Sequence, residues 1–296
     1  MLRCGQLDRH VGATCLLKAE NLQQTGAFKV RGALAALTAD EAARGLVVTA
    51  SAGNFGQGVA FGAEQLGRRC LVFVPESTPS LKIARIERLG GSVRRLGAHF
   101  DDCERLARHF AGENGFDFLH PFDHARVIEG QATAVRELLA EHPSLDVLVV
   151  PCGGGGLLAG AVLACDEARR SPRLVAVEPT RLPSLAACSR NDRPVAVESA
   201  RSLADGIAVR RVGELPWRRV RGRLDRVVTV SEKEIAAAIH FLAVETKQIV
   251  EGAGAAAVAA LLAQPDIARD ARSVGVLVTG GNIDSDVLAR VLGAAG

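Results

Sequence analysis

The sequence predicts an α/β protein with open, mostly parallel sheets flanked by helices. Short apolar runs rich in β-branched residues alternate with longer segments of helical periodicity, and that alternation is typical of parallel βαβ units. Three loops of glycine and small polar residues, at 51–54, 153–156 and 279–282, each follow a predicted strand directly. Ligands of open α/β sheets bind at such carboxyl-end loops, so these loops are the first places to look for a site.

The individual elements follow from the local pattern. Strands are predicted where four to six residues are mostly apolar, as in LVVTA and DVLVV, and helices where apolar residues recur every three or four positions. The predicted strands are 15–18, 46–50, 70–74, 92–96, 116–119, 146–150, 174–177, 227–230 and 274–279. The predicted helices include 30–37, 56–66, 79–89, 99–112, 126–141, 156–169, 231–246 and 252–263.

Two interleaved domains are expected rather than two domains in a line. The segment 45–123 forms a strand–helix series of its own, and no repeat or Pro/Ser-rich linker divides the chain. We therefore predict a large domain of residues 1–44 and 124–296 and a small, mobile domain of residues 45–123.

Composition excludes several classes of protein. Apolar residues make up 48% of the 296 residues, too many for a disordered chain, and no apolar run reaches the roughly 20 residues of a membrane helix. The net charge of +3 does not indicate a nucleic-acid partner. Seven cysteines without a C-x-x-C pair, and no secretory signal, predict a reducing, cytoplasmic location. The arginine cluster at 210–226 is interpreted as a solvated face or interface rim, with nucleic-acid binding as the alternative.

The strongest local signal is the run of four glycines Gly153, Gly154, Gly155 and Gly156 between a strand and a helix. Backbone N–H groups at a helix N-terminus bind anions, and phosphate is the usual anion. The spacing also fits the dinucleotide fingerprint, with Glu178 as a ribose-binding carboxylate, so the residues alone leave an NAD-dependent enzyme open. No Lys-Ser/Thr follows the glycines, which excludes a nucleoside-triphosphate loop.

A second signal is Lys29, one of only five lysines beside 31 arginines. It follows the turn QQTGAF and opens the predicted helix 30–37. A buried lysine in such a place can form a Schiff base. The alternative interpretation is an ordinary solvated lysine.

Eight segments in this order resemble the threonine/serine dehydratase family of pyridoxal-phosphate enzymes, whose fold also contains serine racemase and the tryptophan synthase β-chain. They are LKAENLQQTGAFKVRGA, TASAGNFGQGVA, LHPFD with GQAT, PCGGGGLLAG, AVEP, LADGIAV, EGAGA and TGGNID. The resemblance implies pyridoxal 5'-phosphate in a cleft between two domains, a homodimer and a small amino-acid substrate. It implies an ammonia-lyase that converts L-threonine, L-serine or a related β-hydroxy amino acid to a 2-oxo acid. Another β-elimination or β-replacement enzyme, or a racemase, is the alternative within the fold.

The resemblance also implies roles for residues of the cofactor site. Lys29 corresponds to the Schiff-base lysine and base for the α-proton, and Phe28 packs on the cofactor. Asn54 corresponds to the partner of the cofactor's phenolic oxygen. Thr279 corresponds to the partner of its pyridine nitrogen. The glycines at 153–156, with the amide of Leu157, hold the phosphate.

The substrate site and the departures from the family lie close together. The loop of Ser51, Ala52, Gly53 and Asn54 corresponds to the loop around the substrate carboxylate. Ala52 stands where serine racemase has its second-face serine base, which disfavours racemisation. Phe55 stands where the dehydratases commonly have His, which leaves the preferred substrate open.

Two further departures concern a cation site and the chain ends. Glu178 corresponds to one ligand of a cation site in some relatives, but Ser184 replaces the other acidic ligand, so no metal is predicted. The resemblance leads us to expect a further helix before the first residues, whose absence here is interpreted either as a shortened start of the sequence or as a genuine difference from the family. No regulatory domain is expected after Gly296, which disfavours the feedback-inhibited type.

Overall fold

The computed structural model describes residues 1–39, 45–170 and 172–294. The chain forms two compact units, here called the first unit (Met1–Phe28 and Ala132–Gly296) and the second unit (Lys29–Gln131). Helix α6 (Ala125–Glu141) contains one boundary between them. The division expected from the sequence, with 45–123 as the small domain, stays a prediction beside this grouping.

The first unit is built on a six-stranded sheet of order β1-β2-β10-β7-β8-β9. Only the β1–β2 pair of this sheet is antiparallel, and its other pairs are parallel. The strands are β1 (Leu2–Arg3), β2 (Thr14–Ala19), β10 (Ser273–Val278), β7 (Val147–Pro151), β8 (Arg173–Pro179) and β9 (Arg226–Val230). A sheet of this kind confirms the predicted fold class for this part of the chain.

The helices of the first unit cover this sheet. They are α1 (Gly5–Val11), α7 (Gly156–Glu167), α8 (Ser184–Asn191), α9 (Glu214–Val220), α10 (Glu232–Thr246), α11 (Gly252–Ala263) and α12 (Ser285–Gly293). Three short 3-10 turns join them: η1 (Glu20–Leu22), η2 (Asp205–Ile207) and η3 (Pro265–Ala268). Helix α11 is apolar on all sides and is almost completely buried, as expected of a helix without a polar face.

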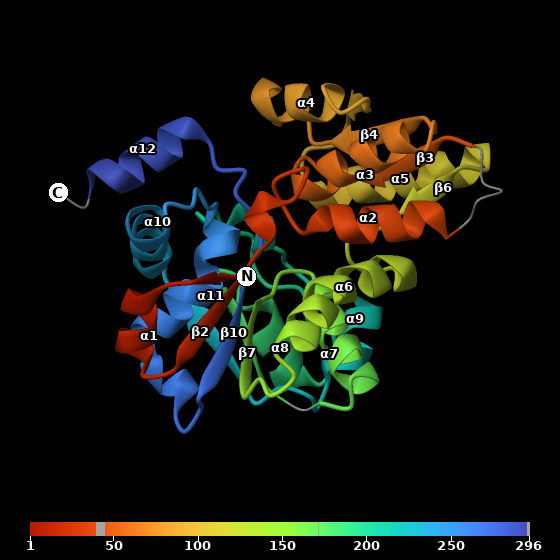
Figure 1. Cartoon of the computed structure of the whole chain (residues 1–296). Coiled ribbons are helices and arrows are strands. Elements are labelled where there is room, and N and C mark those ends of the chain that lie inside the picture. Colours follow the sequence, from red (N-terminus) through yellow and green to blue (C-terminus); the bar gives the residue numbers. More distant parts are fainter. Residues whose placement is uncertain (40–44, 171, 295–296) are drawn as a thin grey trace. The chain divides into compact units, whose positions relative to one another are not determined.

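The second unit has a four-stranded parallel sheet of order β5-β4-β3-β6. Its elements are β3 (Val47–Ala50), β4 (Cys70–Val74), β5 (Ser92–Arg95), β6 (Asp117–Leu119), α2 (Lys29–Thr38), α3 (Asn54–Gln65), α4 (Ser80–Glu87) and α5 (Phe100–Asn114), drawn in Figure 1. Alternate residues of β3 enter two different cores: Val47 packs in one with Phe55, and Val48 packs in the other with Phe73. The sheet is therefore covered by apolar residues on both faces, which is typical of parallel sheets.

All nine predicted strands are confirmed within two residues at each end, as are the helices predicted between them. The strands and α-helices that the sequence analysis missed are β1, α1, α8, α9 and α12, which have two to nine residues each. Such short elements contain too few residues for a clear periodicity. Among the described residues, none of the helices combines the length and apolar character needed to cross a bilayer.

Candidate functional site

The glycine loop lies in the first unit, at the carboxyl end of β7. Helix α7 begins at Gly156, and its N-cap residue Gly155 is in the left-handed region with φ 89°. The N–H of Ala159 donates to the carbonyl of Gly155 at 2.8 Å, so the amides of residues 156–158 have no acceptor within the helix. The N-cap residue Gly155, as a glycine, provides no side-chain cap to this end. The loop therefore presents backbone donors and the positive end of a helix dipole to an anion.

Packing as well as conformation requires glycine in this loop. A Cβ atom on Gly153 would lie 2.8 Å from the Cα of Ile207, and one on Gly155 would lie 2.8 Å from the Cβ of Pro216. The segment 207–216 therefore packs directly on the loop. Because the four glycines carry no side chains of their own, the loop leaves its amides open to a phosphate group.

Thr279 lies at the same edge of the sheet as the glycine loop. Strands β10 and β7 are parallel neighbours, with Val276 opposite Val149. Thr279 follows Val276 by three residues, and Cys152 follows Val149 by three residues. The carboxyl ends of the two strands therefore bring Thr279 beside Cys152, at the start of the glycine loop. Thr279 is buried. Thr279 is therefore shielded from bulk water at this edge.

The chain just before Lys29 is tied to the end of β10. The N–H of Phe28 donates to the carbonyl of Thr279 at 3.0 Å, and Ala27 forms an antiparallel bridge with Gly280. Phe28 is buried. The first unit therefore brings together Phe28, Thr279 and the glycine loop.

Lys29 opens α2 and belongs to the second unit. Its side chain is half-buried. Helices α2 and α3 pack closely at Gly58. A Cβ atom on Gly58 would lie 3.2 Å from the backbone N of Val30 and 3.3 Å from the carbonyl carbon of Lys29. Gly58 is about one helical turn after Asn54, so the second unit brings the backbone of Lys29 within about one turn of the end of the predicted substrate loop.

The predicted substrate loop connects β3 to α3. Gly53 is the N-cap residue of α3 and, as a glycine, provides no side-chain cap. The Gly53 N–H donates to the Ser51 hydroxyl at 3.3 Å, and a Cβ atom on Gly56 would lie 2.3 Å from the Ser51 carbonyl oxygen. The loop thus folds back onto the first turn of its own helix. Its open helix end suits an anionic group such as a carboxylate.

The two residues that depart from the family pattern at this loop, Ala52 and Phe55, both contact an apolar core. Ala52 packs against the apolar core that surrounds α3, and Phe55 is part of that core and is fully buried. Ala52 therefore offers only a methyl group at its position. Phe55 brings an apolar ring where the family commonly has an imidazole.

Glu178 caps the N-terminus of helix α8 inside the first unit. It is fully buried at the end of β8, and its two carboxylate oxygens accept the N–H groups of Leu185 at 2.7 Å and Ala186 at 2.9 Å. Burial raises the pKa of this carboxyl to about 7. A carboxylate that caps α8 is not available to a ribose, which argues against the NAD alternative. The described residues include no group of His, Cys, Asp and Glu side chains arranged to hold a metal.

Cys152 is a buried thiol between β7 and the glycine loop. Burial raises its pKa well above the usual value of a cysteine. Because only the thiolate is a good nucleophile, Cys152 is interpreted as a small apolar filler rather than a nucleophile. The seven cysteines are all buried and free.

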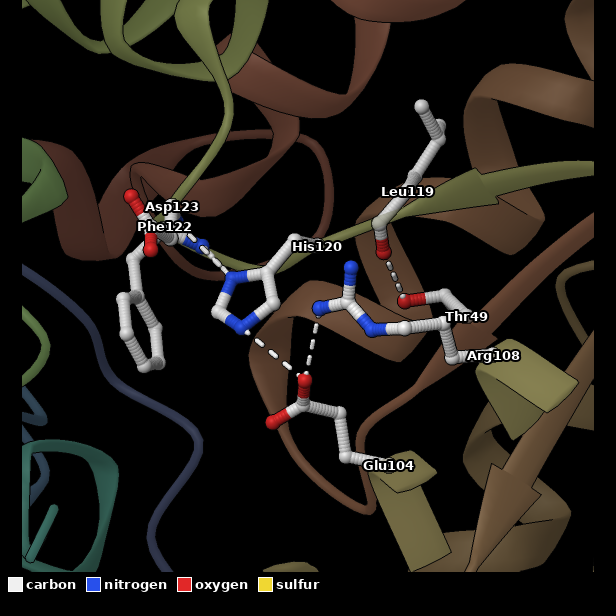
Figure 2. Close-up of polar contacts among 7 residues, drawn as sticks. All are labelled: Thr49, Glu104, Arg108, Leu119, His120, Phe122 and Asp123. Atoms are coloured by element: carbon white, nitrogen blue, oxygen red, sulfur yellow. Dashed lines mark hydrogen bonds and ion pairs between the residues drawn. The ribbon is translucent and has the colours of Figure 1, made fainter. Parts of the chain in front are cut away.

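The LHPFD segment of the second unit is held by a charged network at the end of β6 (Figure 2). The His120 Nδ1 atom accepts the N–H of Asp123 at 2.8 Å and that of Phe122 at 3.3 Å. Nδ1 therefore carries no proton, and the ring proton is on Nε2, which lies 3.4 Å from the Glu104 carboxylate. The same carboxylate accepts from Arg108 at 2.8 Å. The hydrogen bond from His120 is the main reason that the pKa of Glu104 falls to about 2.

Sequence reasoning missed two contributions to these sites. The segment 207–216 packs on the glycine loop. The motif LADGIAV overlaps this segment, but in the sequence it indicates only the family resemblance and not the packing contact. Glu104 holds His120, and LHPFD is the one signal in the sequence that points toward that network. Both partners lie far from the residues they support along the chain, so no local pattern identifies them.

Most of the arginine cluster is paired with acid. Arg211, Arg221, Arg223 and Arg226 form ion pairs with Glu214, Asp192, Asp166 and Asp266 respectively. This pairing supports the interpretation as a solvated face. It offers little net positive charge for a nucleic acid.

Comparison with known proteins is consistent with this geometry. Residues 1–280 match the family described as "Pyridoxal-phosphate dependent enzyme". The chain is 44% identical over 302 residues to an L-threonine ammonia-lyase of Geobacter sulfurreducens, covering all of this chain and 75% of the relative.

Two solved structures have the same fold. A threonine deaminase from T.th. has a TM-score of 0.89 at 38% identity, with 96% of this chain and 92% of that chain covered. The maize serine racemase has a TM-score of 0.91 at 30% identity, with 99% and 91% covered. The chain therefore belongs to the family of pyridoxal-phosphate dependent enzymes, as the order of its motifs indicates.

Proposed function

We propose that this chain is an ammonia-lyase that uses pyridoxal 5'-phosphate to convert L-threonine, L-serine or a related β-hydroxy amino acid to a 2-oxo acid and ammonia. The observation that carries this proposal is the shared edge of the first unit, where an anion cradle, the Thr279 hydroxyl and the segment leading to Lys29 meet. The relatives named threonine ammonia-lyase and threonine deaminase support the same reaction class.

The cofactor site has a donor set that suits pyridoxal phosphate. The amides of the glycine loop and of Leu157 bind the phosphate, and the dipole of α7 favours its negative charge. When bound, the cofactor supplies an aldehyde for the lysine amine and a conjugated ring that accepts the electrons left at the substrate's Cα. Phe28 contributes an apolar surface beside Lys29, and the Asn54 amide is proposed to bond the phenolic oxygen.

Lys29 is proposed to act as both anchor and base. Its Nζ atom, once released by the incoming amino acid, takes the proton from the substrate's Cα. Lys29 is half-buried, and a lysine amine in such a setting can serve as the covalent anchor of a carbonyl group.

Thr279 sets the electronic character of the site. A hydroxyl can hydrogen-bond the pyridine nitrogen but does not provide the negative charge that would keep this nitrogen protonated. Negative charge at Cα is therefore stabilised less strongly than beside a carboxylate. Prompt loss of a β-hydroxyl is favoured over transamination.

The substrate carboxylate is proposed to bind at the N-terminus of α3. The N-cap residue of this helix, Gly53, provides no side-chain cap, and the first-turn amides are proposed to donate to the carboxylate instead. Holding the carboxylate there orients the Cα–H bond toward a base.

Elimination is favoured over racemisation because of Ala52. Racemisation needs an acid that returns the proton on the face opposite the base. The methyl group of Ala52 packs in an apolar core and has no proton to give.

The test follows both products from pure L-serine, pyruvate and D-serine, and the 2-oxo acid from L-threonine. We expect 2-oxo acid to form much faster than D-serine, and Lys29→Ala to lower its formation by roughly a thousandfold while the protein stays folded. Borohydride should attach the cofactor to Lys29 in the wild type. D-serine formed as fast as pyruvate would make the racemase the better assignment. Activity of Lys29→Ala within tenfold of wild type would show that another base acts.

We also propose a cytoplasmic homodimer. Seven buried free thiols suit a reducing compartment. Exposed apolar side chains of the first unit, Leu22, Val244 and Ile249, suit a contact with a second copy. Sedimentation of the purified protein at two concentrations tests the dimer, and fractionation of cells tests the location.

A further inference from the structure

Asn282 fastens the segment before Lys29 to the segment after β10. Its side-chain Nδ2 donates to the carbonyl of Thr25 at 2.8 Å, across 257 residues of sequence. The side chain is half-buried. It lies in the motif TGGNID, three positions after Thr279, and approaches a carbonyl four positions before Lys29. The roles assigned above to the site residues do not include it.

The turn that receives this bond is shaped for it. Gly26 has φ 73°, and a Cβ atom there would lie 2.6 Å from the Asn282 Oδ1 atom. The Gly26 N–H closes the turn by donating to the carbonyl of Gln23 at 2.7 Å. Glycine is therefore required at position 26 both by the backbone conformation and by the space that the Asn282 amide occupies.

Backbone bonds continue the contact toward Lys29. The N–H of Gly281 donates to the carbonyl of Gly26 at 2.8 Å, and the N–H of Phe28 donates to the carbonyl of Thr279 at 3.0 Å. Together with the bridge between Ala27 and Gly280, they form a short two-stranded ladder. Asn282 closes the end of this ladder that lies away from Lys29, so it opposes fraying and slippage of the register.

We propose that Asn282 is a positioning residue, which holds residues 25–28 in register with 279–281 and thereby fixes the segment that leads directly into Lys29. This inference rests on the proposed role of Lys29 as the cofactor anchor. A slip of this register shifts Phe28 and the start of the next residue along the chain, so the Lys29 amine is misplaced for attachment.

Asn282→Asp is the sharpest variant, because it keeps the shape and removes the donor. The new carboxylate oxygen would face the Thr25 carbonyl as a second acceptor. The matched control is Asn191→Asp in α8, since the Asn191 Nδ2 also donates to a backbone carbonyl, that of Ala187, at 2.8 Å. Both variants lose a hydrogen bond from a side-chain amide to a backbone carbonyl, but only the bond of Asn282 adjoins the ladder.

Two probes separate positioning from general damage. Pyridoxal 5'-phosphate loses its aldehyde oxygen as water when the Lys29 amine forms the C=N bond. 4'-Deoxypyridoxine 5'-phosphate has the same ring, phenolic oxygen and phosphate but no aldehyde, so it reports the non-covalent contacts of the cofactor without the bond to Lys29. For Asn282→Asp we expect covalent attachment to Lys29 to slow by about tenfold, in line with one lost hydrogen bond, while affinity for the deoxy analogue stays within about twofold. Asn191→Asp should change neither.

A second pair of variants tests the same contact without introducing charge. Gly26→Ala and Asn282→Ala should each slow the attachment, and the double variant should be no slower than the slower single variant, because the two residues act at one contact. Attachment to Asn282→Asp at the wild-type rate, or an equal loss of affinity for the deoxy analogue, would overturn the positioning role. A wild-type protein that takes up no pyridoxal phosphate on Lys29 would instead overturn the proposed function, and the inference with it.

Discussion

The two candidate anion sites are held in different ways, although each lies where a strand of a parallel sheet leads into a helix. In the first unit a distant segment packs on the glycine loop, at Ile207 and Pro216. In the second unit the loop 51–54 packs on its own helix, through the contact of Gly56 with the Ser51 carbonyl. The first site therefore depends on long-range packing, whereas the second depends on one turn of local backbone.

The largest effect is expected at Gly155. In Gly155→Asp a side chain would have to adopt a positive φ, displace Pro216 and bring a carboxylate to a phosphate. We expect the dissociation constant of pyridoxal phosphate to rise by about a hundredfold or more, since unpaired like charges cost several kcal/mol. Titration of the apo-protein measures it.

Gly222→Asp is the matched control for that variant. Gly222 has φ 70°, and a Cβ atom placed there would meet none of the described atoms within 4 Å, so this variant tests the cost of the backbone conformation alone. Its cofactor affinity should be unchanged. Equal losses in both variants would contradict the anion cradle.

The next effect concerns the second unit. Gly56→Ala pushes a methyl group into the Ser51 carbonyl, 2.3 Å away, whereas Gly53→Ala meets open space among the described residues. We expect Gly56→Ala to raise KM for L-threonine by about tenfold, because a misplaced loop loses hydrogen bonds to the substrate carboxylate. Gly53→Ala should have a clearly smaller effect. The reverse order in steady-state kinetics would show that the contact with the Ser51 carbonyl does not hold the loop.

The two units also contrast in their partly or fully buried carboxylates. Glu178 has two backbone donors and is fully buried, and burial dominates, so its pKa is raised to about 7. Glu104 is bonded to His120 and Arg108, and the bond from His120 dominates, so its pKa is lowered to about 2. Opposite dependences of stability on pH follow in the two units.

Glu104 stabilises the second unit at neutral pH. Its folded-state pKa lies below the ordinary 4.5, so its contribution is present above pH 4.5 and is lost as the pH falls toward about 2. Glu104→Gln should lower stability at pH 7 by about 2 kcal/mol. Hydrogen exchange of the amides of Phe122 and Asp123, which donate to His120, should show the loss, and Glu113→Gln on the exposed face of α5 should not. A difference that persists undiminished near the lowered pKa, at roughly pH 2.5, would contradict the assignment.

Glu178 gives the smaller effect, with the opposite sign. Its folded-state pKa is raised, so its contribution is full below pH 4.5 and is lost as the pH rises through about 7. We expect urea unfolding, followed by the fluorescence of Trp217 in the first unit, to show about 1 kcal/mol less stability on the alkaline side of this range. Glu178→Gln does not titrate and should flatten the profile. A wild-type profile that is already flat would show that Glu178 does not titrate in this range.

Much of the fold could be predicted from local pattern. Parallel strands that are buried on both faces are near-continuous apolar runs, and most of the nine predicted strands are of this kind. All nine occur in the structure, including the mostly exposed β5. The short helices α8 and α9 could not be predicted, because they are fixed by tertiary partners such as the Glu178 carboxylate at the start of α8. The assigned roles of the site residues remain predictions, and the variants above test them.

By itself, the sequence determined the alternation of strands and helices, the glycine run before α7 and the lysine that opens α2, because these features depend on residues near one another in the chain. Only the tertiary structure decided that β10 lies between β2 and β7, which brings Thr279 beside the glycine loop. It also decided that Asn282 reaches the Thr25 carbonyl. Strand order and such contacts depend on burial and hydrogen bonding between segments far apart in the chain, and no local periodicity records them.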